Sequence, residues 1–81
     1  MSKLIDVAEG ILDAKEYTNE NLADCNSVKQ YAEAGLDINL DDIEAGAILS
    51  ACKKWLDGIH SGNLNGSNDY YYTVTNPLQE L

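Results

Sequence analysis

The feature that most constrains the fold is a long predicted helix that begins near Asp41 and ends before Gly62. Asn39 or Asp41 is placed to cap it, and the glycine follows its last turn. Wound at about 100° per residue, its apolar side chains cover more than half of its circumference. They are Leu40, Ala47, Ile48, Ala51, Cys52, Trp55, Leu56 and Ile59. Such a helix must be covered on several sides, so we expect it to be the centre of the core.

Two shorter helices are predicted ahead of it. The first runs from Ser2 to about Tyr17, and its apolar residues recur at spacings of three and four and form one stripe. The second lies between Ser27, which opens a capping-box pattern, and Gly35, which is placed to end it. Residues 18–26 either extend a helix or serve as a connector.

The amino-acid composition changes after Gly62. A turn rich in Asn, Gly and Ser leads into Tyr70–Thr75, a run of residues that favour strands. In a strand, Tyr70 and Tyr72 would face one way and Tyr71 the other. No second stretch of this kind is available to pair with it. The run could cover the long helix near Trp55, pair with a second copy, or add to a partner's sheet.

These elements predict a mainly α protein. It would be a small three-helix domain at residues 1–62, with a long central helix as its third, followed by a C-terminal extended arm at residues 63–81. The 81 residues allow one domain with one modest core, and 44% hydrophobic residues is normal for a globular chain.

The charge balance restricts the partners. Fourteen acidic residues against five lysines give a formal net charge of −9, and no arginine is present. The guanidinium group, which binds phosphate through two parallel hydrogen bonds, is therefore missing. We expect no direct binding to nucleic acid or to an anionic membrane. A partner with a basic surface is expected instead. The absence of a signal-peptide pattern and of a disulfide framework predicts a cytoplasmic protein.

An acidic row runs along the first predicted helix. Asp6, Glu9, Asp13 and Glu16 follow one another at steps of three, four and three residues, roughly 5 Å per charge along the axis. Only Lys3 is placed to reach this row, at Asp6. The row is either an ordinary solvated face or a binding surface for a cationic groove.

The sequence carries no pattern typical of an active site. His60 is the only histidine and has no nucleophile at a useful spacing. Asp37, Asn39 and Asp41 have the opening spacing of a calcium loop, but Asp42 stands where its turn glycine belongs. We expect no enzyme activity, no metal and no cofactor.

The resulting hypothesis is a small acidic protein-binding module that occupies a basic, nucleic-acid-binding surface of a larger protein. It would act as an inhibitor or regulator and as a nucleic-acid mimic, as phage- or mobile-element-encoded inhibitors do. The acidic row would steer the module toward the basic surface and dock there, and Tyr70, Tyr71 and Tyr72 would anchor the contact. The alternative is a homo-oligomeric building block, at its simplest a homodimer, that assembles through the tyrosine arm and the face of the long helix.

Overall fold

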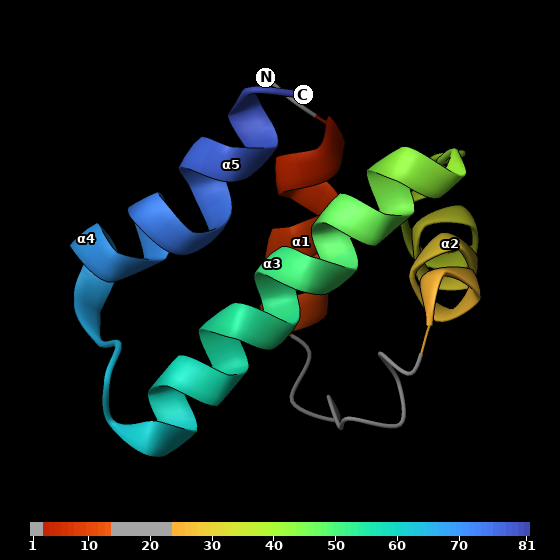
Figure 1. The fold of residues 1–81 in the computed structure, drawn as a ribbon. Helices are drawn as coiled ribbons and strands as arrows, with labels where there is room; N and C mark the ends of the chain where they lie inside the picture. Colours follow the sequence, from red (N-terminus) through yellow and green to blue (C-terminus); the bar gives the residue numbers. More distant parts are fainter. Residues whose placement is uncertain (1–2, 14–23) are drawn as a thin grey trace.

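The computed structural model describes residues 3–13 and 24–81, and it is mainly helical, with no strand among these residues (Figure 1). The elements are α1 (Lys3–Asp13), α2 (Cys25–Leu36), α3 (Asp42–Ser61), α4 (Gly66–Tyr70), the π-helical turn η1 (Tyr71–Thr75) and α5 (Asn76–Gln79). No helix among the described residues is long and apolar enough to cross a membrane.

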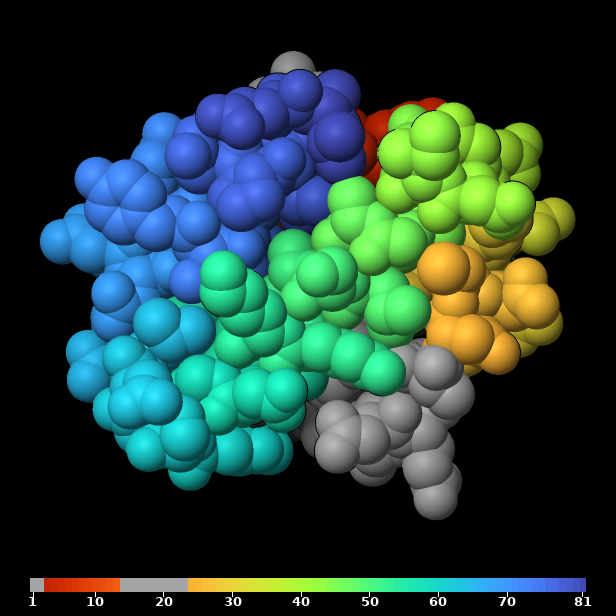
Figure 2. Space-filling model, viewed as in Figure 1, coloured from red at the N-terminus to blue at the C-terminus, as the bar shows by residue number. Residues whose placement is uncertain are grey.

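The prediction that the long helix forms the centre of the core is confirmed. α3 contacts α1, α2, η1 and α5, and in Figure 1 it crosses the molecule with α2 on one side and the C-terminal segment on the other. The space-filling view from the same side shows α3 and the C-terminal segment meeting along one face, with α1 almost hidden behind them (Figure 2). The buried core consists of Leu4, Ile5, Val7, Ala8, Ile11, Val28, Ala32, Ala45, Ile48, Ala51, Cys52, Val74 and Leu78.

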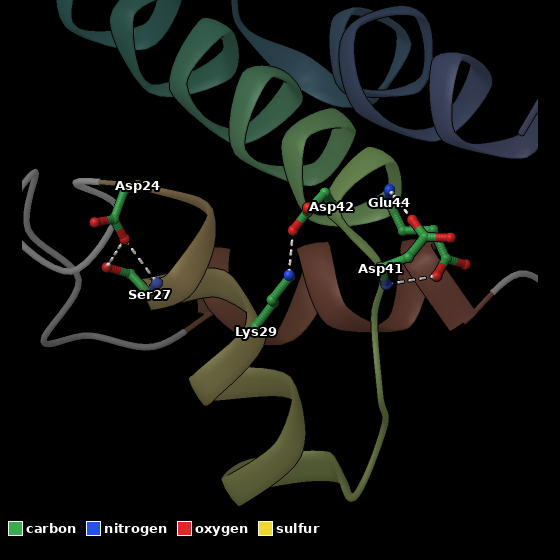
Figure 3. Close-up of polar contacts among 6 residues, drawn as sticks. All are labelled: Asp24, Ser27, Lys29, Asp41, Asp42 and Glu44. Carbon is green, nitrogen blue, oxygen red and sulfur yellow. Dashed lines mark hydrogen bonds and ion pairs between the residues drawn. The ribbon is translucent and has the colours of Figure 1, made fainter.

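Local chemistry sets both ends of α3, and of the two candidate caps, Asn39 and Asp41, it is Asp41 that caps the helix. The Asp41 carboxylate accepts a hydrogen bond from the Glu44 backbone N–H at 2.7 Å, and the Glu44 carboxylate accepts one from the Asp41 N–H at 3.0 Å (Figure 3). This reciprocal capping box satisfies two N–H groups that the first turn leaves without helical partners. At the other end, Gly62 has φ 79°, the left-handed conformation that glycine adopts without strain.

The ends of α2 differ from the prediction. The cap is Asp24, not Ser27, because the Asp24 carboxylate accepts hydrogen bonds from both the backbone N–H (2.9 Å) and the hydroxyl (3.1 Å) of Ser27 (Figure 3). Gly35 does not end the helix; the left-handed residue is Asp37, with φ 55°. Short polar residues tolerate this conformation better than most. Residues 25 and 26 therefore belong to α2, and residues 18–23 lie outside the described part of the chain.

The first predicted helix is confirmed over its described part, α1. Its predicted apolar stripe faces the core, with Leu4, Ile5, Ala8 and Ile11 buried. Gly10 permits close contact with α2, since a Cβ atom at this position would lie 2.7 Å from the Tyr31 hydroxyl oxygen.

The predicted C-terminal extended arm is wrong, because α4, η1 and α5 follow one another as a helical segment from Gly66 to Gln79. Val74 is completely buried and Leu78 is 1% exposed. Intrinsic preference for strand is weak, and tertiary packing routinely overrides it. Here a strand would have found no partner for its backbone groups, whereas a helix satisfies them internally.

Spacing explains how this segment reaches the core. Tyr70, Val74 and Leu78 follow one another at steps of four residues, and each such step advances about 40° around a regular α-helix. The π-helical turn at Tyr71–Thr75 holds more residues per revolution, so it reduces this drift. The three side chains are therefore kept close to one line, which faces the core.

A proline lies two residues after the end of the π-helical turn. Pro77 has no N–H to donate to the carbonyl of Thr73, and in a regular helix its ring would collide with that carbonyl. The Asn76 N–H instead donates to the carbonyl of Tyr71, which is the wider hydrogen-bond pattern of a π-turn. The proline and the wide turn are thus compatible, and the Leu78 side chain is still buried in the core.

Candidate protein-binding surface

The outer face of α1 carries the predicted acidic row. Asp6, Glu9 and Asp13 are all exposed, while Val7, Ala8 and Ile11 between them are buried. Glu16, the fourth member of the predicted row, lies outside the described residues. The described part of α1 therefore presents three carboxylates on one side, which is the arrangement the sequence spacing predicted.

The lysine expected to reach this row points elsewhere. Lys3 Nζ lies 3.2 Å from Glu44 Oε2 and donates to the carbonyl of Asn39, also at 3.2 Å. The expected contact with Asp6 is replaced because the capped N-terminus of α3 offers Lys3 both a carboxylate and a backbone carbonyl. Among the described residues, Asp6 consequently forms no ion pair.

A second lysine is also engaged outside the row. Lys29 of α2 forms an ion pair with Asp42 in the first turn of α3 (Figure 3). This contact raises the pKa of the Lys29 ammonium and lowers the pKa of the Asp42 carboxyl. The remaining described lysines, Lys53 and Lys54, are exposed on α3. No described lysine forms an ion pair with a member of the α1 row.

The three predicted tyrosines do not share one environment. Tyr70 packs edge-on against Trp55, with 5.1 Å between ring centroids and 87° between ring planes. Burial raises the pKa of the Tyr70 phenol to about 12, and the negative charges of Glu9 and Asp13 contribute to the shift. The expectation that the tyrosine run covers the long helix near Trp55 is thus confirmed for Tyr70. The phenol also lies within electrostatic range of the acidic row.

The other two tyrosines face solvent. Tyr71 is 44% exposed and Tyr72 is 70% exposed, and their rings contact each other edge-on at 5.3 Å. Strand geometry predicted that Tyr70 and Tyr72 would face the same way, whereas the helix turns Tyr70 inward and presents its two successors. The helical spacing of Tyr70, Val74 and Leu78 was the signal in the sequence that could have revealed this.

Acidic and aromatic groups therefore lie on neighbouring elements, since α1 contacts η1. We define the acid–tyrosine surface as the exposed residues Asp6, Glu9, Asp13, Tyr71 and Tyr72. Tyr70, which packs against Trp55, is not part of it. Carboxylates can attract a cationic partner from a distance, and exposed tyrosines can bury area while they keep a polar tip for hydrogen bonding.

Outside this surface, the described part of the chain contains Cys25, Cys52 and His60. No group of three or more His, Cys, Asp or Glu side chains there could hold a metal ion. Cys52 is buried, which raises the pKa of its thiol to about 12, and Cys25 is a half-buried free thiol. His60 is exposed in the last turn of α3.

A shallow groove lies on a different face, where the C-terminal segment meets α3 (Figure 2). Its volume is about 320 Å³. It is lined by Ala47, Ser50, Ala51 and Lys54 of α3 and by Thr73, Pro77, Leu78 and Leu81. Sequence reasoning missed this groove because it exists only when residues 66–79 are helical.

Comparison with known proteins gives no relative: no family model, no curated protein and no solved structure matches this chain.

Proposed function

We propose that this protein is a small acidic protein-binding module that occupies a basic surface of a larger protein. The observation that carries the proposal is the outer face of α1, where Asp6, Glu9 and Asp13 are exposed and no described lysine forms an ion pair with them. An ordinary solvated helix interleaves such charges with lysines. Here Lys3 and Lys29 instead bind acidic residues of α3.

Binding would proceed in two stages with different physical origins. The carboxylates, added to a net charge of −9, attract a cationic surface during diffusion and raise the association rate. Tyr71 and Tyr72 then bury apolar area, and the contact slows dissociation. A basic surface that binds nucleic acid fits this chemistry best, because it is built to receive a row of negative charges. The module would act as an inhibitor that competes with nucleic acid for that surface.

The test is capture of partners from a lysate of the native host, with the protein immobilised through an added tag. We expect the wild type to retain a basic protein that a rise in salt releases, because screening weakens contacts between opposite charges. The triple variant Asp6→Asn, Glu9→Gln, Asp13→Asn should retain much less of it. The captured protein should also lose its binding to nucleic acid when the wild-type module is added.

A matched control separates this surface from net charge. Glu33→Gln, Asp57→Asn and Glu80→Gln remove the same three charges at exposed positions outside the acid–tyrosine surface. This control variant should capture the partner nearly as well as the wild type. Equal capture by both triple variants would show that the α1 row is only a solvated face, and the proposal would fail.

A further inference from the structure

The short link that joins α3 to α4 contains an asparagine that directly precedes a glycine (Figure 1). Asn65 and Gly66 form the only such pair in the chain. The backbone nitrogen that follows an asparagine can attack the side-chain amide, and glycine hinders this attack least because it has no side chain. Both residues are exposed, so water reaches the reacting groups.

The two reacting groups are free of competing hydrogen bonds. The Asn65 carboxamide does not cap α4, and it forms no other hydrogen bond among the described residues. The Gly66 N–H donates no hydrogen bond to any of these residues either. Gly66 has φ 78°, and no atom lies within 4 Å of the position that a Cβ atom would take. The space beside the attacking nitrogen is therefore open.

A second asparagine in the same link has different surroundings. Asn63 is exposed, but the nitrogen that follows it belongs to Leu64, which carries a bulky side chain. This nitrogen donates a hydrogen bond to the Gly58 carbonyl at 3.0 Å, so it is held against the end of α3. The structure therefore distinguishes Asn65 from its neighbour in the link.

We propose that Asn65 is a site of spontaneous deamidation in the folded protein. The Gly66 nitrogen attacks Asn65 Cγ and forms a C–N bond, and the side-chain nitrogen leaves as ammonia with the proton that the Gly66 nitrogen gives up. The product is a cyclic imide. Water then adds to one of its two carbonyl carbons and breaks the ring. Opening at the side-chain carbonyl gives aspartate, and opening at the main-chain carbonyl gives isoaspartate.

One hydrogen bond slows this reaction in the folded chain. The Asn65 N–H donates to Asp69 Oδ2 at 2.8 Å, and Asn65 has an extended backbone with ψ 156°. At this ψ the Gly66 nitrogen is turned away from Asn65 Cγ, so the Cα–C bond must rotate before the attack. The hydrogen bond ties the Asn65 nitrogen to a residue beyond the rotating bond, and it therefore resists the rotation. The rate of deamidation depends on how often the link leaves this conformation.

The product alters the link that positions the C-terminal segment. Each modified chain gains one negative charge close to the Asp69 carboxylate, on a chain whose net charge is already −9. Isoaspartate also routes the backbone through the side-chain carbon, which lengthens the link. The segment that follows buries Val74 and Leu78 and presents Tyr71 and Tyr72. Deamidation is thus an irreversible change at the junction between the long helix and the segment that covers it.

Incubation of the folded full chain in mildly alkaline buffer tests the proposal. Samples taken at intervals are digested with pepsin at low pH, where the reaction is slow, and tandem mass spectrometry locates each amide that has become an acid. We expect Asn65 to lose its amide first and to give both aspartate and isoaspartate peptides, which chromatography separates. Asn63 should keep its amide over the same period, so it serves as the internal control.

Three variants test the roles of the side chains. Asp69→Ala removes the acceptor of the Asn65 N–H and should raise the rate by about two- to tenfold, which corresponds to the net contribution of one hydrogen bond. Asp69→Asn removes the charge but keeps an acceptor oxygen, and its rate should stay closer to that of the wild type. Asn65→Gln should keep its amide, because a longer side chain must close a larger ring. Circular dichroism checks that the variants are folded.

The proposal is overturned if wild-type Asn65 keeps its amide as long as Asn63 does. It is also overturned if the acid formed there includes no isoaspartate, because direct hydrolysis by water gives aspartate alone. The restraint by Asp69 is refuted if folded Asp69→Ala reacts no faster than Asp69→Asn. None of these outcomes depends on the proposed binding function, because the reaction is followed in the isolated chain.

Discussion

At the scale of single residues, the end of α3 depends on one glycine whose role is steric. A Cβ atom on Gly58 would lie 2.2 Å from Leu64 Cδ1 and 3.0 Å from Leu64 Cβ. Leu64 cannot simply move away, because its backbone N–H donates to the Gly58 carbonyl at 3.0 Å. The glycine thus lets the chain after α3 fold back closely onto the helix.

We predict opposite effects for two glycine substitutions within α3. Gly58→Ala should lower the free energy of unfolding. Overpacking usually costs about 1–3 kcal/mol, and the better helix propensity of alanine offsets roughly 1 kcal/mol of that cost. Gly46→Ala, where the new Cβ would meet only Cys25 Sγ at an ordinary 3.8 Å, should stabilise by up to about 1 kcal/mol. Urea unfolding followed by circular dichroism measures both. Equal effects at the two sites would contradict the steric role of Gly58.

Residue-scale features were predictable where they depend on neighbours in sequence. The stop at Gly62 and a cap at either Asn39 or Asp41 follow from residues within one helical turn, and the structure selects Asp41. The start of α2 was not predicted, since Asp24 and Ser27 are both good caps and only their mutual hydrogen bonds select Asp24. Lys3 was assigned to Asp6 because the sequence does not show that α3 places Glu44 beside it.

At the scale of elements, the C-terminal segment illustrates two competing periodicities. The run Tyr70–Thr75 consists of strand formers, and this local preference predicts a strand. The wider window contains Tyr70, Val74 and Leu78 at helical spacing, and Trp55 is available to pack against the first of them. Burial of this apolar line determined the outcome, since a completed core contributes more free energy than a local preference. The sequence indicated that other parts of the chain must pack on the long helix, but not whether they would do so as a strand or as a helix.

We predict that this segment is part of the core in energetic terms. Leu78→Ala should destabilise the protein by about 2–5 kcal/mol, because it removes a side chain that is 1% exposed and leaves a cavity. Tyr72→Ala, at a side chain that is 70% exposed, should change stability by about 0.5 kcal/mol or less. Thermal and urea unfolding of the two variants provide the comparison. A small effect of Leu78→Ala would mean that the segment is only attached to a core that is stable without it.

At the scale of the whole molecule, the excess of negative charge acts against folding. Glu9 and Asp13 lie one helical turn apart on α1, and like charges at this spacing cost a few tenths of a kcal/mol. The net charge of −9 adds a general repulsion in the compact state. The acidic row therefore lowers the stability of the folded chain slightly.

We predict that neutralising this pair stabilises the protein. Glu9→Gln with Asp13→Asn should raise the free energy of unfolding by a few tenths of a kcal/mol at low salt. The gain should disappear at about 1 M NaCl, where the screening length is only about 3 Å. Urea unfolding at the two salt concentrations measures it. A loss of stability at low salt would instead reveal favourable contacts of these carboxylates within the chain.

The candidate surfaces were predictable to different extents for a related reason. The acidic row lies within one helix, so the spacing of Asp6, Glu9 and Asp13 alone placed them on one face. The proximity of Tyr70 to this row and the groove beside Lys54 each depend on two or three elements that meet only in the folded chain. Periodicity reports the faces of single elements and contains no information on which faces become neighbours.

The π-helical turn at Tyr71–Thr75 has a consequence for how the sequence can change over evolutionary time. It works as one extra residue accommodated within a helix. Loss of a single residue between Tyr70 and Leu78 would rotate everything beyond the gap by about 100° and turn Leu78 away from the core. Substitutions at the exposed positions Tyr71 and Tyr72 would leave the register intact. We therefore expect homologues to keep the length of this stretch and the apolar character of Val74 and Leu78, while replacements are tolerated at its exposed positions. A single-residue deletion there should be selected against more strongly than a replacement at an exposed position.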